Sequence, residues 1–118
     1  MKRHNFKELK IWHSSMELAR EIYNVTADFP KTELYGLTQQ IRRCAISVPS
    51  NIAEGCGRGT DPQLAHFLDI AQGSAFELET QLYLSNQLNF LSQETTNTLI
   101  TKVIELQKMI DGFKNRIS

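Results

Sequence analysis

Apolar side chains recur every three or four residues along four successive stretches of this chain, and this spacing constrains the fold more than any other feature. In the last stretch the steps alternate between four and three, through Leu99, Val103, Leu106, Ile110, Phe113 and Ile117. This is the a/d spacing of helices that pack side by side. No alternating strand pattern competes with it, so we predict an all-α protein.

Short breaks divide the pattern into helices that we expect at about 7–29, 33–56, 61–89 and 93–116. Pro30 ends the first helix, because proline donates no backbone hydrogen bond and disfavours helical backbone in the preceding residue. Gly55, Gly57 and Gly59 end the second, since glycine is a poor helix former. Loops this short make neighbouring helices antiparallel. The chain should therefore form one domain over residues 1–118, an up-down-up-down four-helix bundle.

Polar residues mark the expected helix starts. Thr32 is a candidate cap for the second helix and Ser92 for the fourth. The third has two candidates, because Thr60 makes a capping box with Gln63 whereas Asp61 precedes a proline at the first helical position. The sequence does not choose between them.

Pro49 lies inside the second predicted helix. It removes the hydrogen bond to the Ala45 carbonyl and crowds that turn, at a cost of about 3 kcal/mol. Ile52 nevertheless keeps the phase of the apolar positions that precede Pro49. We therefore predict a kink at Pro49 rather than the end of the helix.

Composition excludes several protein classes. A hydrophobic fraction of 41% and a charged fraction of 22% argue against disorder and against small disulfide scaffolds. Cys44 and Cys56 lack the spacing of a metal site or a secreted framework, so we expect reduced thiols. The sequence shows neither a signal core nor a run of membrane-spanning length. We expect a cytoplasmic protein with no membrane contact.

Some helices carry more apolar surface than a lone bundle needs. The first has a second apolar line from Ile11 to Phe29, and the fourth adds Ile100 and Ile104. Surplus apolar surface commonly marks an interface. We therefore predict a homo-oligomer.

A polar stripe runs along the second predicted helix, about 100° around from its apolar face. Its members are Gln40, Arg43, Ser47, Asn51, Glu54 and Arg58. One interpretation is a solvated face in which Glu54 and Arg58 pair one turn apart. The other is a polar interface between subunits or with RNA, because amides and small hydroxyls are more frequent here than on an ordinary charged face.

The third predicted helix has a comparable line of His66, Gly73, Glu77 and Gln81. Gly73 permits close approach of another backbone, and its helical cost of about 1 kcal/mol suggests that something packs there. We predict an ion pair between Glu77 and Arg43 across adjacent helices.

The sequence provides little for catalysis. Di-iron bundles use Glu-x-x-His motifs, which are absent, and His13 with Glu17 one turn away falls far short of a metal site. There is no nucleophile elbow, and the glycine loop lacks the Lys-Ser/Thr ending of a P-loop. We predict a protein that is not an enzyme and has neither metal nor cofactor.

Basic residues are concentrated in the first half of the chain, although the 13 basic and 13 acidic side chains cancel overall. Residues 1–60 hold nine basic and six acidic side chains. Arg58 precedes the amino end of the third helix, where free N–H groups favour anions. The candidates for phosphate contact are Lys7, Lys10, Arg42, Arg43 and Arg58.

Two runs of residues resemble a known family. They are Tyr35-Gly36-Leu37-Thr38-Gln39-Gln40-Ile41-Arg42-Arg43 and Ser47-Val48-Pro49-Ser50-Asn51-Ile52-Ala53-Glu54-Gly55. Together with Trp12, Phe29-Pro30 and the Gly73-Ser74 to Gln81 region, they are similar to the four-helix bundle proteins encoded in 23S ribosomal RNA intervening sequences. The similarity covers nearly the whole chain.

The resemblance implies an antiparallel bundle that assembles as a ring-shaped homopentamer. Accessory variability determinant proteins of diversity-generating retroelements resemble the same bundle, and they bind nucleic acid and a reverse transcriptase through a basic surface. Those relatives are markedly basic, whereas this chain is neutral. We therefore expect an oligomeric scaffold or accessory protein that contacts RNA or an RNA-processing partner. The alternative is a module that binds only proteins.

Overall fold

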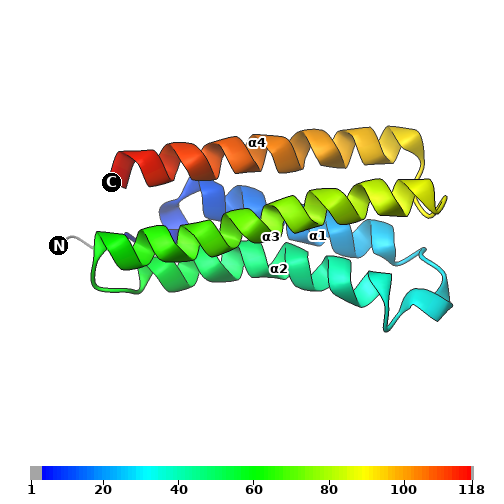
Figure 1. Ribbon diagram of the computed structural model, residues 1–118, viewed down its shortest axis with the longest axis horizontal. Helices are drawn as coiled ribbons and strands as arrows, with labels where there is room; N and C mark the ends of the chain where they lie inside the picture. The colour runs from blue at the N-terminus through cyan, green and yellow to red at the C-terminus, as the bar shows by residue number, and fades with distance from the viewer. Residues whose placement is uncertain (1–3, 118) are drawn as a thin grey trace.

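The structure is a computed structural model that describes residues 4–117. It contains four α-helices and two short 3-10 turns, with no strand in that range. The helices and turns are η1 (Phe6–Glu8), α1 (Lys10–Thr26), η2 (Lys31–Glu33), α2 (Leu37–Cys56), α3 (Asp61–Gln87) and α4 (Gln93–Ile117). Each helix runs antiparallel to the one before it, which confirms the predicted up-down-up-down bundle (Figure 1).

The helices form a four-sided arrangement. α2 packs against α1 and α3, α4 packs against the same two helices, and α1 and α3 lie diagonally opposite. Figure 1 shows α3 in front and α1 behind. The described ends of the chain meet at one end of the bundle, where the rings of His4 and Phe113 are 5.3 Å apart.

Aliphatic side chains from all four helices fill the core, as their spacing predicts. The largest fully buried ones include Ile22, Ile41, Leu78 and Ile110. Burial of each such side chain stabilises the fold by about 1.5–3 kcal/mol. The a/d positions of the last helix from Leu99 to Phe113 are all buried, so that register is confirmed.

The start of α3 resolves the two capping alternatives. The Thr60 hydroxyl accepts a hydrogen bond from the backbone N–H of Gln63 at 3.3 Å and donates to the Gln63 side chain at 3.1 Å. Asp61 is already the first helical residue. Ser92 caps α4 as predicted, because its hydroxyl accepts from the Thr95 N–H at 3.1 Å.

The boundaries of the first two helices differ from the prediction. The first predicted helix is divided, because Leu9 has extended backbone between η1 and α1, and α1 ends at Thr26 rather than at Phe29. α2 begins at Leu37 rather than near Glu33. Thr32 lies inside η2 and does not cap α2. The Glu33 carboxylate accepts from the Leu37 N–H at 3.2 Å instead.

Gly55 sets how closely α2 and α3 pack. It lies in the last turn of α2, next to the final helical residue Cys56, which is where the predicted helix also ends. A Cβ atom at Gly55 would lie 2.9 Å from both Leu64 Cδ1 and Phe67 Cβ of α3.

Pro49 also lies within α2, which continues past it. The kink there stays a prediction.

Candidate functional site

The polar stripe on α2 is partly buried against α3. Ser47 Oγ and Ser74 Oγ share a hydrogen bond of 2.8 Å. Asn51 Nδ2 donates to the Ser47 carbonyl at 2.8 Å and to the Ser47 hydroxyl at 2.9 Å. The middle of the stripe is therefore a structural seam between two helices of one chain, whereas Gln40 and Glu54 are exposed.

Glu77 takes a different partner from the predicted one. Its carboxylate oxygen Oε2 accepts a hydrogen bond from Cys44 Sγ at 3.4 Å, and the ion pairs of residues 4–117 do not include one with Arg43. Burial, with the nearby Glu77 carboxylate, raises the pKa of the Cys44 thiol, while Gln81 opposes the rise. The predicted Arg43–Glu77 ion pair is wrong, because Glu77 accepts from Cys44 and Arg43 forms no ion pair among residues 4–117.

The paired arginines have different environments. Arg42 is half-buried between α1 and α2, where its Nε donates to Thr26 Oγ1 at 2.8 Å and its guanidinium lies 4.6 Å from the centre of the Tyr23 ring. Arg43 is exposed, and within the described part of the chain it has neither a hydrogen-bond nor an ion-pair partner. Arg43 is thus the outward-facing arginine, a choice that periodicity alone left open.

Arg58 is already engaged within its own chain. It forms an ion pair with Glu54 at 2.7 Å, as the spacing of one helical turn predicted, and its guanidinium lies 4.8 Å from the centre of the Phe67 ring. Both partners of the ion pair are about half exposed, so the pair contributes at most about 1 kcal/mol. An anion at Arg58 would compete with Glu54.

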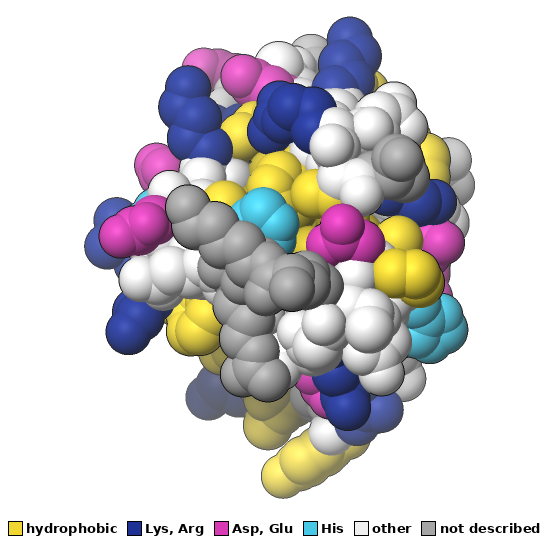
Figure 2. Space-filling view, turned by 90° about the vertical axis from the view of Figure 1, so that its left-hand side faces the viewer, with side chains coloured by type: hydrophobic (Ala, Val, Ile, Leu, Met, Phe, Trp, Pro, Cys, Tyr) yellow, Lys and Arg dark blue, Asp and Glu magenta, His cyan; other side chains and the backbone are white. Residues whose placement is uncertain are grey.

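The five predicted phosphate contacts do not form one surface. Arg43 lies within the first two turns of α2, whereas Arg58 lies in the loop after α2, at the opposite end of that helix. This loop is at the end of the bundle where the chain begins. Lys7 and Lys10 are exposed near the end of the bundle where the chain begins. Figure 2 shows this end, where Lys and Arg side chains are spread around the rim with acidic side chains between them.

A more basic groove lies beside this end, between the start of α1 and the last turns of α4. It has a volume of about 460 Å³, and Lys10, Lys108 and Arg116 line it together with the acidic Glu105. Lys108 and Arg116 were not among the phosphate contacts predicted from the sequence. The up-down topology could have found them, because it brings the first residues of α1 beside the last residues of α4.

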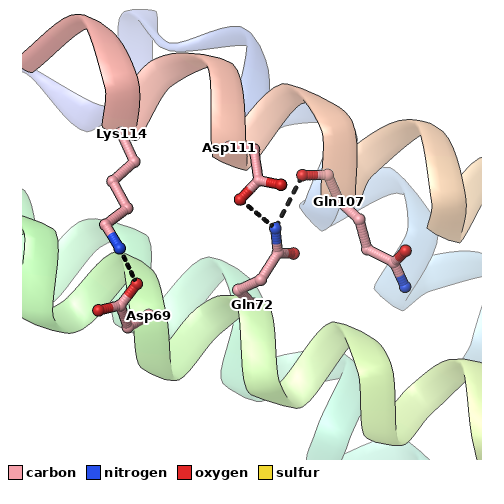
Figure 3. Close-up of polar contacts among 5 residues, drawn as sticks. All are labelled: Asp69, Gln72, Gln107, Asp111 and Lys114. Carbon is pink, nitrogen blue, oxygen red and sulfur yellow. Dashed lines mark hydrogen bonds and ion pairs between the residues drawn. The ribbon is translucent and has the colours of Figure 1, made fainter.

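Polar side chains also connect α3 to α4 (Figure 3). Gln72 Nε2 donates to the Gln107 carbonyl and to Asp111, each at 2.9 Å, and Lys114 pairs with Asp69. Gln107 in turn donates to Glu79 at 2.8 Å. These contacts fix the register of the two helices and occupy several of the acidic groups of α3.

A second groove, which is mainly apolar, lies between α1 and α2. It consists of two adjoining hollows of about 730 and 580 Å³ that share Tyr23 and Ile46. Met16 and Pro49 line the larger hollow, and Tyr35, which is 86% exposed, lines the smaller one. We call this the α1–α2 groove.

The line from Ile11 to Phe29 that the sequence marked as surplus is instead mostly core, since Ile11, Ile22 and Phe29 are buried. The first helix contributes Met16 and Tyr23 to the groove, and these belong to its other apolar line.

Residues 4–117 hold no group of three or more His, Cys, Asp and Glu side chains suited to a metal ion. His13, the candidate considered from the sequence, is exposed, and its Nε2 lies 2.6 Å from the Lys7 carbonyl oxygen. His66 is also exposed and lies beside the Phe67 ring.

Among the described residues, no helix is long and apolar enough to cross a membrane.

Comparison with known proteins gives one family. The profile of the family described as 23S rRNA-intervening sequence protein matches residues 7–112. A similar solved structure is that of a protein of unknown function, assigned to the S23 ribosomal protein family, from Bacteroides thetaiotaomicron. It superposes with a TM-score of 0.82 at 22% identity, over 89% of this chain and 95% of that one. No curated protein matches this chain.

Proposed function

This chain belongs to the family of 23S rRNA-intervening sequence proteins, and from that premise we propose that it is a non-enzymatic, homo-oligomeric scaffold that contacts RNA. The groove formed by Lys10, Lys108 and Arg116 is the observation that carries the RNA contact. Three cations around one hollow, with a single carboxylate among them, suit the phosphates of a nucleic acid backbone. Arg43 provides a further unpaired cation within the described chain.

Assembly strengthens this proposal. One copy has no net charge, so a single groove attracts RNA weakly. Several copies joined in one particle present several grooves to the same RNA, and their weak contacts combine. The family resemblance implies a homopentamer. The exposed apolar side chains of α1, α2 and α3 support self-association without fixing the number of copies.

Fluorescence anisotropy of a labelled structured RNA, titrated with the protein at two salt concentrations, tests the RNA contact. We expect binding that weakens steeply with salt. Lys10→Gln with Lys108→Gln should weaken it and lower the salt slope by about 0.7–0.9 for each phosphate that the protein no longer neutralises. Lys31→Gln is the matched control, because Lys31 is exposed near the opposite end of the bundle. Absence of binding at low salt would contradict the proposal.

The α1–α2 groove favours a second candidate function, a module that binds only proteins. An apolar groove between two helices suits an amphipathic helix of a partner. Capture of the same protein from extracts before and after nuclease treatment separates the two functions. A partner that persists after nuclease treatment favours the protein module, and one that disappears favours the RNA scaffold.

A further inference from the structure

We infer that the outward face of α3 in one copy packs into the α1–α2 groove of the next copy. This inference rests on the homo-oligomeric assembly proposed above, and it assigns the two surfaces that form each contact.

The outward face of α3 is unusually apolar for a solvated helix. Ile70, Phe76 and Leu84 are all exposed there, with Phe76 54% exposed. The inward face is apolar as well, since Leu64, Leu68, Leu78 and Leu82 are fully buried. Apolar side chains of α3 therefore extend beyond the face that packs inside the bundle, and exposed apolar surface of this kind commonly marks an interface.

Gly73 lies on this outward face. Apart from its chain neighbours and the nearby backbone of α3, no atom of the described residues lies within 4 Å of the position that a Cβ atom would occupy there. Glycine costs about 1 kcal/mol relative to alanine inside a helix, so the fold of one copy gains nothing from it. A missing side chain does allow a neighbouring molecule to approach the helix closely. The close packing that the sequence predicted at Gly73 is therefore absent within one chain, and it is available to a second copy.

The charges of the two surfaces are complementary. α3 has four acidic residues and neither lysine nor arginine. Asp69 and Glu79 are engaged by α4, which leaves Asp61 and Glu77 as the exposed carboxylates without a partner on α4. Arg20, Arg42 and Arg43 line the α1–α2 groove, together with one acidic side chain, Glu17. Apolar burial then drives the contact, and the arginines orient it. This complementarity favours a second copy over an unrelated partner.

One copy cannot cover its own groove. α1 and α3 occupy diagonal positions in the bundle, so the groove and the outward face of α3 lie on different sides of the molecule. The contact between copies is therefore heterologous, and each copy uses both surfaces. Contacts of this kind either close into a ring or extend into a filament.

Two variants test the assignment by light scattering after gel filtration. Ile46→Glu places a charge in the groove, and Gly73→Met fills the space on α3. Neither change disturbs the core, because Ile46 is 43% exposed and Gly73 faces open space. Each variant alone should run as a monomer of 13.5 kDa. An equimolar mixture should give a 1:1 dimer that grows no further, because only one intact groove and one intact α3 face can meet.

Gly112→Met is the matched control. Gly112 is also helical with open space at its Cβ position, but it lies on α4, so this variant should keep the wild-type mass. Circular dichroism checks that each variant folds. Tyr35→Ala and Gly73→Ala replace any variant that loses helicity.

The outcomes separate this inference from the proposed function. If the wild type assembles and both variants keep its mass, the assignment of surfaces is wrong while the oligomer stands. Dimers formed by Ile46→Glu alone would also overturn it, because α3 would then pack against α3. A monomeric wild type overturns both the inference and the oligomer, and leaves the RNA titration as a separate test.

Discussion

Gly55 is a position where adding even one methyl group should destabilise the fold. The alanine Cβ would have to displace Leu64 and Phe67, which lie 2.9 Å away, and so would push α3 from α2. Overpacking of this kind costs about 1–3 kcal/mol, so Gly55→Ala should lower the free energy of unfolding by that amount in urea denaturation. Gly112→Ala is the control, and it should be neutral or stabilising because nothing lies near its Cβ position.

The two buried cysteines predict a pH dependence of stability. Burial raises the pKa of both the Cys44 and Cys56 thiols. The folded protein therefore keeps protons that the unfolded chain loses as the pH rises. The stabilisation is complete below the unfolded thiol pKa of about 8.5 and is lost as the pH rises through the folded values.

Urea denaturation between about pH 7 and 9.5 measures this effect, since the range spans the ordinary thiol pKa. The free energy of unfolding should fall with increasing pH in the wild type. It should fall less in the variant with Cys44→Ala and Cys56→Ala. Equal slopes in the two proteins would show that the thiols do not carry the effect.

The arginine pair shows what residue spacing can and cannot predict. Helical periodicity places Arg42 and Arg43 on different sides of α2, as the structure confirms. Their partners depend on the rotation of α1 and α3 about their own axes, and spacing within one helix does not fix that rotation. For this reason the Thr26 contact of Arg42 was missed and the Glu77 partner of Arg43 was wrong.

At the scale of the element, the start of α3 gives a direct test of capping. Thr60→Ala removes the acceptor for the Gln63 N–H and should cost about 1 kcal/mol in thermal or urea unfolding. Thr60→Ser keeps the hydroxyl and should retain most of that stability. If Thr60→Ala were as stable as the wild type, the cap would have no energetic role.

The four helices and their order could be predicted from the sequence, whereas the end of α1 and the start of α2 could not. The apolar period extends as far as Phe29, which is buried although α1 ends at Thr26. Phe29 reaches the core from the loop after α1, so it continues the apolar spacing of the helix although its own backbone is not helical. Spacing alone therefore placed the helix end too late. Glu33 similarly satisfies the first N–H of α2 from outside that helix, so the search for a Ser or Thr cap selected the wrong residue.

At the scale of the whole molecule, assembly and RNA binding should respond differently to salt. The surfaces assigned to self-contact are mainly apolar, and burial of apolar surface does not weaken as salt screens charges. Phosphate contacts do weaken, because bound counterions are released less favourably. The mass of the assembly should stay constant between about 0.1 and 1 M NaCl, a range over which the Debye length shrinks from about 10 to 3 Å, while RNA affinity falls. Dissociation of the assembly at high salt would point to a contact made mainly by charges.

The closeness of the two described ends of the chain, where His4 packs against Phe113, has a consequence for topology. Because α4 packs against α1 as well as α3, the four helices form a closed cycle in which every helix has two antiparallel neighbours. A circular permutant that starts at Gly59, with a short linker joining the original ends, would preserve each of these neighbours. The same bundle should therefore form even when the helices follow one another along the chain in a different order.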